Sequence, residues 1–206
     1  MPAPPLVLAS QSPRRLLLLR QIGIEPSVIA DPAVAEFPLA DETPEKYADR
    51  LALAKAAAIA SAWPQAFVLA ADTIVAVGRR ICGKAETAAD AARFLNLLSG
   101  RRHRVISSVA VIAPEGRAPG LARAHGLKRV VSRVRFKRLH EAEISAYVAG
   151  NEWRGKAGGY AIQGQAGAFV MALEGSYSGV VGLPLYETLA LLQGLGFRPG
   201  HDGKVS

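Results

Sequence analysis

The chain has 206 residues, a length that favours a single domain with a substantial core, and its hydrophobic fraction of 50% argues against disorder. A formal net charge of +8 favours an anionic partner, whether a nucleotide, a nucleic acid or an acidic surface. The aromatic content of only 6% provides few of the stacking platforms that nucleic-acid-binding surfaces use. Cys82 is the single cysteine, which excludes an intrachain disulfide, a cysteine-rich zinc site and an iron–sulfur cluster.

The N-terminal apolar stretch does not have the character of a targeting segment. Its leucines are interrupted by Arg14, Arg15 and Arg20, and no apolar run approaches the roughly 20 residues that span a bilayer. We therefore expect a cytoplasmic protein with no membrane partner, folded as one domain over residues 1–206.

The stretch from Leu6 to Leu19 (LVLASQSPRRLLLL) predicts a strand over residues 6–8, a polar turn, and a helix that begins at Pro13 and ends near Gly23. Ser12 is a suitable N-cap for that helix, and proline is favoured at the first helical position. Arg14 and Arg15 then place two cations in the first turn, where the helix dipole disfavours each by roughly 0.3–1 kcal/mol. This points to an anion such as a polyphosphate, although arginine pairs also occur on solvated helix faces.

A second helix is predicted over residues 43–63, with Thr43 as its N-cap. Arg50 and Lys55 fall within the arc of its apolar positions, so each either reaches back to solvent or points into a cleft. The buried stripe is predicted to contain Tyr47, Leu51, Ala54 and Ala58.

Residues 66–78 (AFVLAADTIVAVG) predict a buried strand that carries one acid, Asp72, in its middle. A carboxylate there is costly unless it is paired, binds a metal or faces a cleft, and the neighbouring Thr73 is polar too. Asp72 is therefore a functional candidate, with a structural ion pair as the alternative. Glu36 lies in an otherwise apolar proline-containing segment of strand and loop that precedes the second helix.

The segment Gly78–Lys84 has the GxxxxGK spacing of a phosphate-binding P-loop. The next residue is Ala85, however, where that motif requires the hydroxyl of a serine or threonine. The sequence VAVGRRICGK is better interpreted as a β-hairpin that turns at residues 78–80 and has Lys84 at the end of its second strand.

The second half of the chain predicts helices over residues 87–100, 141–150 and 184–195, and strands over 101–113 and 117–139. His103 has no second histidine or acid at metal-ligand spacing, so we expect it to be structural. The alternating basic and apolar residues of the later strand predict one solvated face. A glycine-rich stretch from residue 151 onward, which includes Lys156 and Gln163, implies turns and a close approach to a ligand, or simply a structural loop.

Three separated stretches, LASQSPRR, AADTIVAV with GKAET, and GKAGGYAIQG with GSYSGVVGLPL, resemble the signature motifs of the Maf family of nucleoside triphosphate pyrophosphatases. They occur in the family's order and extend from residue 6 to about 195. The resemblance implies a mixed α/β, Maf/ITPase-like fold in which helices flank an elongated twisted sheet and a central cleft separates two lobes. It also implies a homodimer that hydrolyses a nucleoside triphosphate to the monophosphate and pyrophosphate with a divalent metal cation (Mg, Mn or Co).

Within the family, the resemblance is to the branch that acts on dTTP and UTP, and it rests largely on Thr73 and Gln163. It implies that Asp72 activates water, that Lys55 and Lys84 assist catalysis, and that Glu36 and Asp72 hold the metal. The substrate-binding residues that it implies are Ser10, Arg14, Arg15, Thr73, Lys156 and Gln163.

Two alternatives stay open. The enzyme could act on modified or purine nucleotides, or the chain could be a basic nucleic-acid-binding module that uses residues 101–104 and 129–137. The resemblance implies a nucleoside triphosphate as substrate and no specific nucleic-acid partner.

Overall fold

The computed structural model describes residues 4–116 and 124–199. Its strands are β1 (Leu6–Ala9), β2 (Val28–Ala30), β3 (Phe67–Val77), β4 (Arg80–Cys82), β5 (Arg102–Ile112), β6 (His125–Phe136) and β7 (Val170–Glu174). Its helices are α1 (Pro13–Gln21), α2 (Pro44–Ala60), α3 (Ala88–Leu98), α4 (Glu141–Ala149), the 3-10 helix η1 (Gln165–Phe169), α5 (Tyr177–Val181) and α6 (Leu185–Gly194). Within these residues no helix is both long and apolar enough to cross a membrane.

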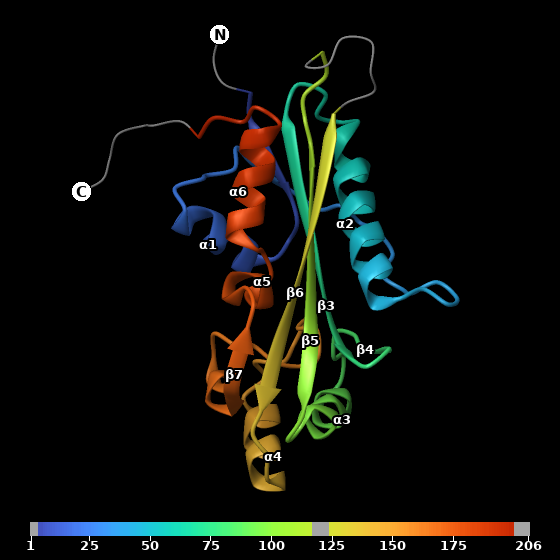
Figure 1. Ribbon diagram of the computed structural model, residues 1–206, viewed down its shortest axis with the longest axis vertical. Coiled ribbons are helices and arrows are strands. Elements are labelled where there is room, and N and C mark those ends of the chain that lie inside the picture. The colour runs from blue at the N-terminus through green and yellow to red at the C-terminus, as the bar shows by residue number, and fades with distance from the viewer. Residues whose placement is uncertain (1–3, 117–123, 200–206) are drawn as a thin grey trace, which may run out of the picture.

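The strands form one mixed, seven-stranded sheet in the order β2-β1-β3-β5-β6-β7, with β4 paired to β3. β1 runs parallel to β2 and β3, whereas the pairs along the rest of the sheet are antiparallel. β3, β5 and β6 are long and twist through most of the length of the molecule (Figure 1). The predicted mixed α/β fold with an elongated twisted sheet is confirmed.

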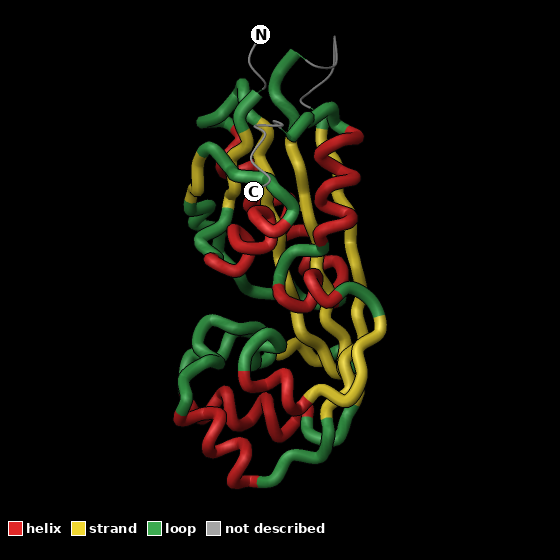
Figure 2. The backbone as a smooth tube through the Cα atoms, turned by 90° about the vertical axis from the view of Figure 1, so that its left-hand side faces the viewer, coloured by secondary structure: helices red, strands yellow, loops and turns green. Residues whose placement is uncertain are grey.

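Helices cover the sheet differently at its two ends. At one end α1 and α6 lie on one face and α2 on the other, while α3 and α4 lie at the opposite end (Figure 1). Figure 2 shows the two lobes that result, joined by the long strands. Each lobe has its own apolar core, with Leu19, Phe67 and Leu192 in one and Leu95, Phe136 and Trp153 in the other. The predicted two-lobed architecture is therefore confirmed.

The helix starts follow the sequence signals closely. α1 begins at Pro13, but the Ser12 side chain makes no capping bond, which corrects its expected role. Instead, the Ser12 backbone N–H donates to Ser10 Oγ at 3.2 Å, so the Ser10 side chain stabilises the turn that precedes the helix. α2 begins as predicted, with Thr43 Oγ1 accepting from the Lys46 N–H at 3.3 Å, and it ends at Ala60 rather than Trp63.

The predicted buried stripe of α2 was partly wrong. Tyr47 and Leu51 are buried, but Ala54 is only half-buried and Ala58 is exposed. The buried face continues instead through Ala52, Lys55, Ala56 and Ala60. Ala52, Ala56 and Ala60 pack against residues of β1, β3 and β5, so the position of the sheet decides which alanines of α2 are covered.

The hairpin interpretation of the P-loop-like segment is confirmed. β3 and β4 pair in antiparallel register around a turn at Gly78 and Arg79, and Gly78 has a φ of 58° that suits glycine. Lys84 follows β4 and forms an isolated antiparallel bridge with Ala157 of the glycine-rich segment. The lysine therefore lies between two loops and not at the start of a helix.

The strand predicted over 117–139 is β6, while residues 117–123 lie outside the described residues. The glycine-rich stretch contains a strand, β7, that its sequence did not predict. His103 lies in the core, where burial lowers its pKa to about 4 and its Nε2 lies 2.9 Å from the Tyr160 hydroxyl. This location agrees with the structural role expected for His103.

Candidate active site

A cleft of about 930 Å³ lies between the two lobes. Its walls come from the β1–α1 turn, the loop before α2, the middle of β3, the segment after β4, residues 154–163 and α5. Every residue that the resemblance implicates lines this one cleft: Ser10, Arg14, Arg15, Glu36, Lys55, Asp72, Thr73, Lys84, Lys156 and Gln163. Segments far apart in the sequence thus converge on one site.

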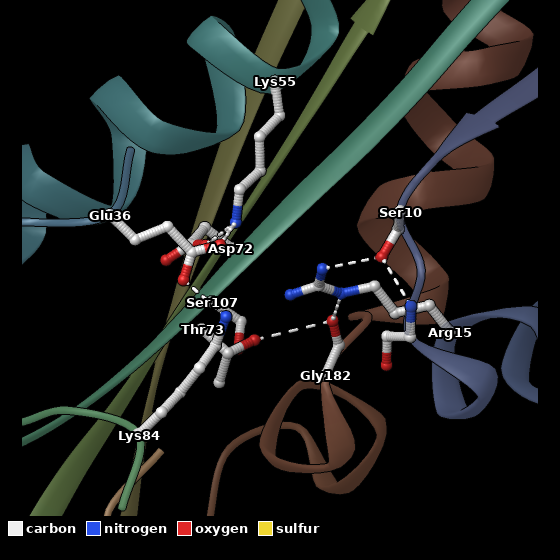
Figure 3. Close-up of polar contacts among 10 residues, drawn as sticks. Ser10, Arg15, Glu36, Lys55, Asp72, Thr73, Lys84, Ser107 and Gly182 are labelled. Carbon is white, nitrogen blue, oxygen red and sulfur yellow. Dashed lines mark hydrogen bonds and ion pairs between the residues drawn. The ribbon is translucent and has the colours of Figure 1, made fainter. Parts of the chain in front are cut away.

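A cluster of two lysines and two carboxylates forms one wall of the cleft (Figure 3). Lys55 Nζ lies 2.5 Å from Asp72 Oδ1 and 2.6 Å from Glu36 Oε1, and Lys84 Nζ lies 2.5 Å from Glu36 Oε2. The side chains of Lys55 and Asp72 are each only 6% exposed. Lys55 therefore points into the cleft and not back to solvent, whereas Arg50 pairs with Glu42 at 2.7 Å.

The lysines control the charge of Glu36. Burial by itself would raise the pKa of this carboxyl, but hydrogen bonds from Lys55 and Lys84 outweigh burial and hold the pKa below its usual value. Glu36 is therefore ionised at neutral pH. Tyr47, which also lines the cleft, has its pKa raised to about 12 by burial and by the charges of Asp72 and Glu36, so it stays protonated.

The two arginines are held by the carboxyl end of α5. Arg15 Nε donates to the Gly182 carbonyl at 2.9 Å and its Nη1 donates to Ser10 Oγ at 3.0 Å, while Arg14 Nε donates to the Val181 carbonyl at 3.3 Å. Burial lowers the pKa of both guanidinium groups, and the neighbouring Arg15 charge lowers that of Arg14 further. Two partly buried cations side by side form a strong attractor for a polyphosphate.

Thr73 lies on the opposite face of β3 from Asp72, because successive strand residues alternate. Its Oγ1 is 3.1 Å from Ser107 Oγ and 3.5 Å from the Gly182 carbonyl. Ser107 does not line the cleft but contacts Thr73, and sequence reasoning did not connect it with the site. The pairing register of β3 with β5, which sets Thr73 opposite Ser107, is the information that would have found it.

The other lobe contributes Lys156, Gln163 and Arg154. Burial lowers the pKa of Lys156, and the charge of Arg14 lowers it further, while Lys156 Nζ donates to the Arg154 carbonyl at 2.9 Å. Gln163 is exposed at the cleft wall. Arg154, which the sequence did not single out, lines the cleft beside them with its guanidinium 4.6 Å from the Trp153 ring centre.

The donors available for a divalent cation are Glu36 and Asp72, whose carboxylates converge on the same Lys55 ammonium. Within residues 4–116 and 124–199 there is no group of three or more histidine, cysteine, aspartate or glutamate residues that could hold a metal by themselves. Magnesium commonly binds through one or two carboxylates together with substrate phosphates and water. The pair therefore fits a cation that arrives with a phosphorylated ligand.

These features define a class: a two-lobed α/β protein whose basic, carboxylate-containing cleft is suited to phosphorylated anions. The model of the Maf-like protein family matches residues 5–195, so the chain belongs to the Maf family.

Two similar proteins have the curated name dTTP/UTP pyrophosphatase. The one from Rhodospirillum rubrum is 60% identical over 97% of this chain and 91% of its own length. The one from Caulobacter vibrioides is 58% identical over 95% of this chain and 98% of its own. The Ham1 protein of Staphylococcus aureus is a more distant structural match, with 17% identity and a TM-score of 0.38 over 63% of this chain and 71% of its own, values too low to bear on fold or function.

Proposed function

We propose that this chain is a nucleoside triphosphate pyrophosphatase that hydrolyses dTTP and UTP to the monophosphate and pyrophosphate. One observation carries the proposal: a buried carboxylate, Asp72, lies in the same cleft as a cluster of four cations, Arg14, Arg15, Lys55 and Lys84. The names of the relatives that are 52–60% identical over nearly the whole chain support the choice of substrates.

Substrate binding follows from the charges of the cleft. Ser10, Arg14 and Arg15 provide a hydroxyl and two guanidinium groups for the phosphate chain, with Lys156 on the facing wall. Lys55 and Lys84 are engaged with carboxylates in the free protein, so they add positive charge next to the phosphates without leaving their partners. Neutralisation of the triphosphate by positioned cations is the main requirement for cleaving a phosphoanhydride bond.

The water that attacks phosphorus needs a base, and we assign this role to Asp72, a buried carboxylate that lines the cleft. Lys55 donates to one of its oxygens, Oδ1, which orients the carboxylate and leaves its other oxygen for proton transfer. Glu36 and Asp72 would hold the divalent cation. When bound, such a cation would neutralise negative charge on the phosphate oxygens.

The direct test is to incubate the protein with dTTP or UTP and magnesium, manganese or cobalt, and to resolve the products. We expect nucleoside monophosphate and pyrophosphate in equal amounts. Release of orthophosphate as the first product would contradict cleavage between the α- and β-phosphates. A panel that includes purine and modified triphosphates tests the alternative substrates, and a higher kcat/KM on any of them would replace dTTP and UTP in the proposal.

The role of Asp72 is tested by Asp72→Asn, which keeps the shape but removes the base. We expect kcat to fall about 10²- to 10⁴-fold. Asp49→Asn is the matched control, because Asp49 is a carboxylate of α2 that pairs with Arg129 at 2.8 Å and does not line the cleft. Full activity in Asp72→Asn would remove the assignment.

A homodimer and a cytoplasmic location stay predictions. Analytical ultracentrifugation of the purified chain tests the dimer, and fractionation of cells tests the location.

A further inference from the structure

Ser107 is a buried hydroxyl next to the cleft for which the proposed mechanism has no use. It is 1% exposed and lies on β5 directly opposite Thr73 of β3. Its Oγ is 2.6 Å from the Gly179 carbonyl of α5 and 3.1 Å from Thr73 Oγ1, and Figure 3 labels Ser107 next to Thr73. These two contacts determine where the hydroxyl protons go.

The direction of each hydrogen bond follows from counting protons. A carbonyl oxygen only accepts, so the single hydroxyl proton of Ser107 goes to Gly179. Between Ser107 and Thr73 the donor must then be Thr73. The other neighbour of the Thr73 hydroxyl, the Gly182 carbonyl, is also an acceptor but lies at 3.5 Å, so Ser107 at 3.1 Å is the nearer partner that directs the proton of Thr73 into the protein.

Toward the cleft, Thr73 Oγ1 therefore presents only its lone pairs, so it can accept a hydrogen bond from a ligand but cannot donate one. Phosphate oxygens are acceptors, and two acceptors cannot form a hydrogen bond with each other. The Thr73 hydroxyl in this orientation therefore does not bind the triphosphate. It suits a ligand group that donates. The imide N3–H of uracil and thymine is such a donor, whereas the corresponding N3 of cytosine is an acceptor.

We infer that Ser107 is a positioning residue that fixes the Thr73 hydroxyl as a hydrogen-bond acceptor for the imide N–H of a uracil or thymine base. The inference rests on the proposed function, because it assumes a pyrimidine nucleotide in this cleft. It explains in chemical terms how a single hydroxyl separates UTP and dTTP from CTP.

The test is the ratio of binding constants for non-hydrolysable α,β-imido analogues of UTP and CTP, measured by calorimetry with magnesium. In Ser107→Ala, Thr73 keeps only the distant Gly182 carbonyl, so its hydroxyl turns and donates to cytosine N3. We expect the preference for the UTP analogue to fall about five- to tenfold, the worth of one hydrogen bond. An unchanged ratio would overturn the inference.

Ser108→Ala is the matched control. It makes the same serine-to-alanine change at the next residue of β5. The Ser108 hydroxyl, however, donates to Asp49 Oδ1 at 2.6 Å on the other face of the sheet. We expect its UTP-to-CTP ratio to equal that of the parent.

Repeating the Ser107→Ala substitution in a Thr73→Val variant shows whether Ser107 acts through Thr73. Thr73→Val by itself should lower the ratio, and adding Ser107→Ala to it should change the ratio no further. A further loss in the double variant would overturn the positioning role. If Ser107→Ala does not fold, as thermal denaturation would show, Thr73→Val provides the test, and an unchanged ratio in Thr73→Val overturns the inference.

A sugar hydroxyl is the competing donor. If Thr73 accepted from it, Ser107→Ala would alter the preference for dTTP over its 3′-deoxy counterpart and leave the UTP-to-CTP ratio intact, which overturns the imide assignment. Equal binding of both analogues by the parent protein also overturns it. A parent that prefers the UTP analogue but hydrolyses neither UTP nor dTTP instead removes the proposed function and leaves the inference standing.

Discussion

Lys55 holds two carboxylates together at the centre of the cleft. Its ammonium contacts Asp72 at 2.5 Å and Glu36 at 2.6 Å in a position that is almost fully buried. Removing one member of a buried ion cluster is far more costly than removing the whole cluster, because the remaining charge has no partner. The residue that stabilises this part of the fold is therefore one that the proposed reaction also uses.

Lys55→Met tests this coupling. It leaves Asp72 buried without its cation, and we expect the free energy of unfolding to fall by about 3 kcal/mol in chemical denaturation. The double variant Lys55→Met/Asp72→Asn removes both charges and should recover a large part of the loss. If the double variant is less stable than Lys55→Met, the ion pair is not what the single substitution disrupts.

Glu36 gives the site a dependence on pH. Its pKa in the folded protein is lowered from the ordinary value of 4.5, so its contribution to stability is fully present above pH 4.5 and is lost as pH falls through the lower folded value. Glu36→Gln should therefore cost stability at pH 7, and the difference from the parent should shrink below pH 4.5. Urea denaturation at pH 7, 5, 4 and 3 measures it, and a difference that grows toward acid pH would contradict the prediction.

The short helix α5 organises the cleft through its carboxyl end. Carbonyls of Gly179, Val181 and Gly182 accept hydrogen bonds from Ser107, Arg14 and Arg15, in that order. Backbone carbonyls at the end of a helix of only five residues thus contact both arginines, and Ser10 Oγ also accepts from Arg15. Its geometry depends on Gly182, which has a φ of 142°, a conformation that side chains rarely adopt.

Gly182→Ala should strain this end of the helix and displace the carbonyl that holds Arg15. We expect a stability loss of about 1–3 kcal/mol and a several-fold rise in KM for UTP. Gly23→Ala is the control, because Gly23 also has a positive φ of 71° but follows α1 and does not line the cleft. Both variants should lose stability in thermal denaturation, but a matching rise in KM in Gly23→Ala would show that strain anywhere weakens binding.

The elements that the sequence predicted well are those with local signals. Pro13 and Thr43 mark helix starts, and the alternation within residues 66–78 marks a strand, because caps and periodicity act over a few residues. β7 was missed since it lies among glycines and is defined by its pairing with β6. The buried face of α2 was misplaced for the same reason, as the sheet decides which alanines are covered.

The site residues also divide into those that the sequence indicates locally and those that only the tertiary structure reveals. Asp72 and Lys55 stood out because a charge in an apolar stretch is costly and demands a partner. Ser107 gave no such signal, because serine in a strand is unremarkable until the register of β3 with β5 brings it to Thr73. Motif resemblance gathered the other site residues, and the fold was needed to show that they share one cleft.

At the scale of the whole molecule, the net charge of +8 includes cations that are paired with acidic side chains and cations that are not. Four of the cations that suggested a nucleic-acid surface, on β5, on β6 and just after β6, have acidic partners: Arg104 pairs with Glu45, Arg129 with Asp49, Arg133 with Glu174, and Lys137 with Glu143. Paired surface charges release few counterions when a polyanion approaches. In the cleft, by contrast, Arg14 and Arg15 donate to carbonyl and hydroxyl oxygens, so their positive charges are available to a phosphate.

This distribution predicts different salt dependences for two kinds of anion. A nucleotide reaches partly buried guanidinium groups that salt screens weakly, so KM for UTP should rise only a few-fold between 50 and 200 mM salt. A fluorescent oligonucleotide meets the paired outer surface, and we expect a Kd of about 10⁻⁴ M or weaker at 150 mM salt, measured by anisotropy. Submicromolar binding that falls away steeply with salt, and that weakens in Arg129→Ala/Arg133→Ala, would instead identify the strand surface as a nucleic-acid site.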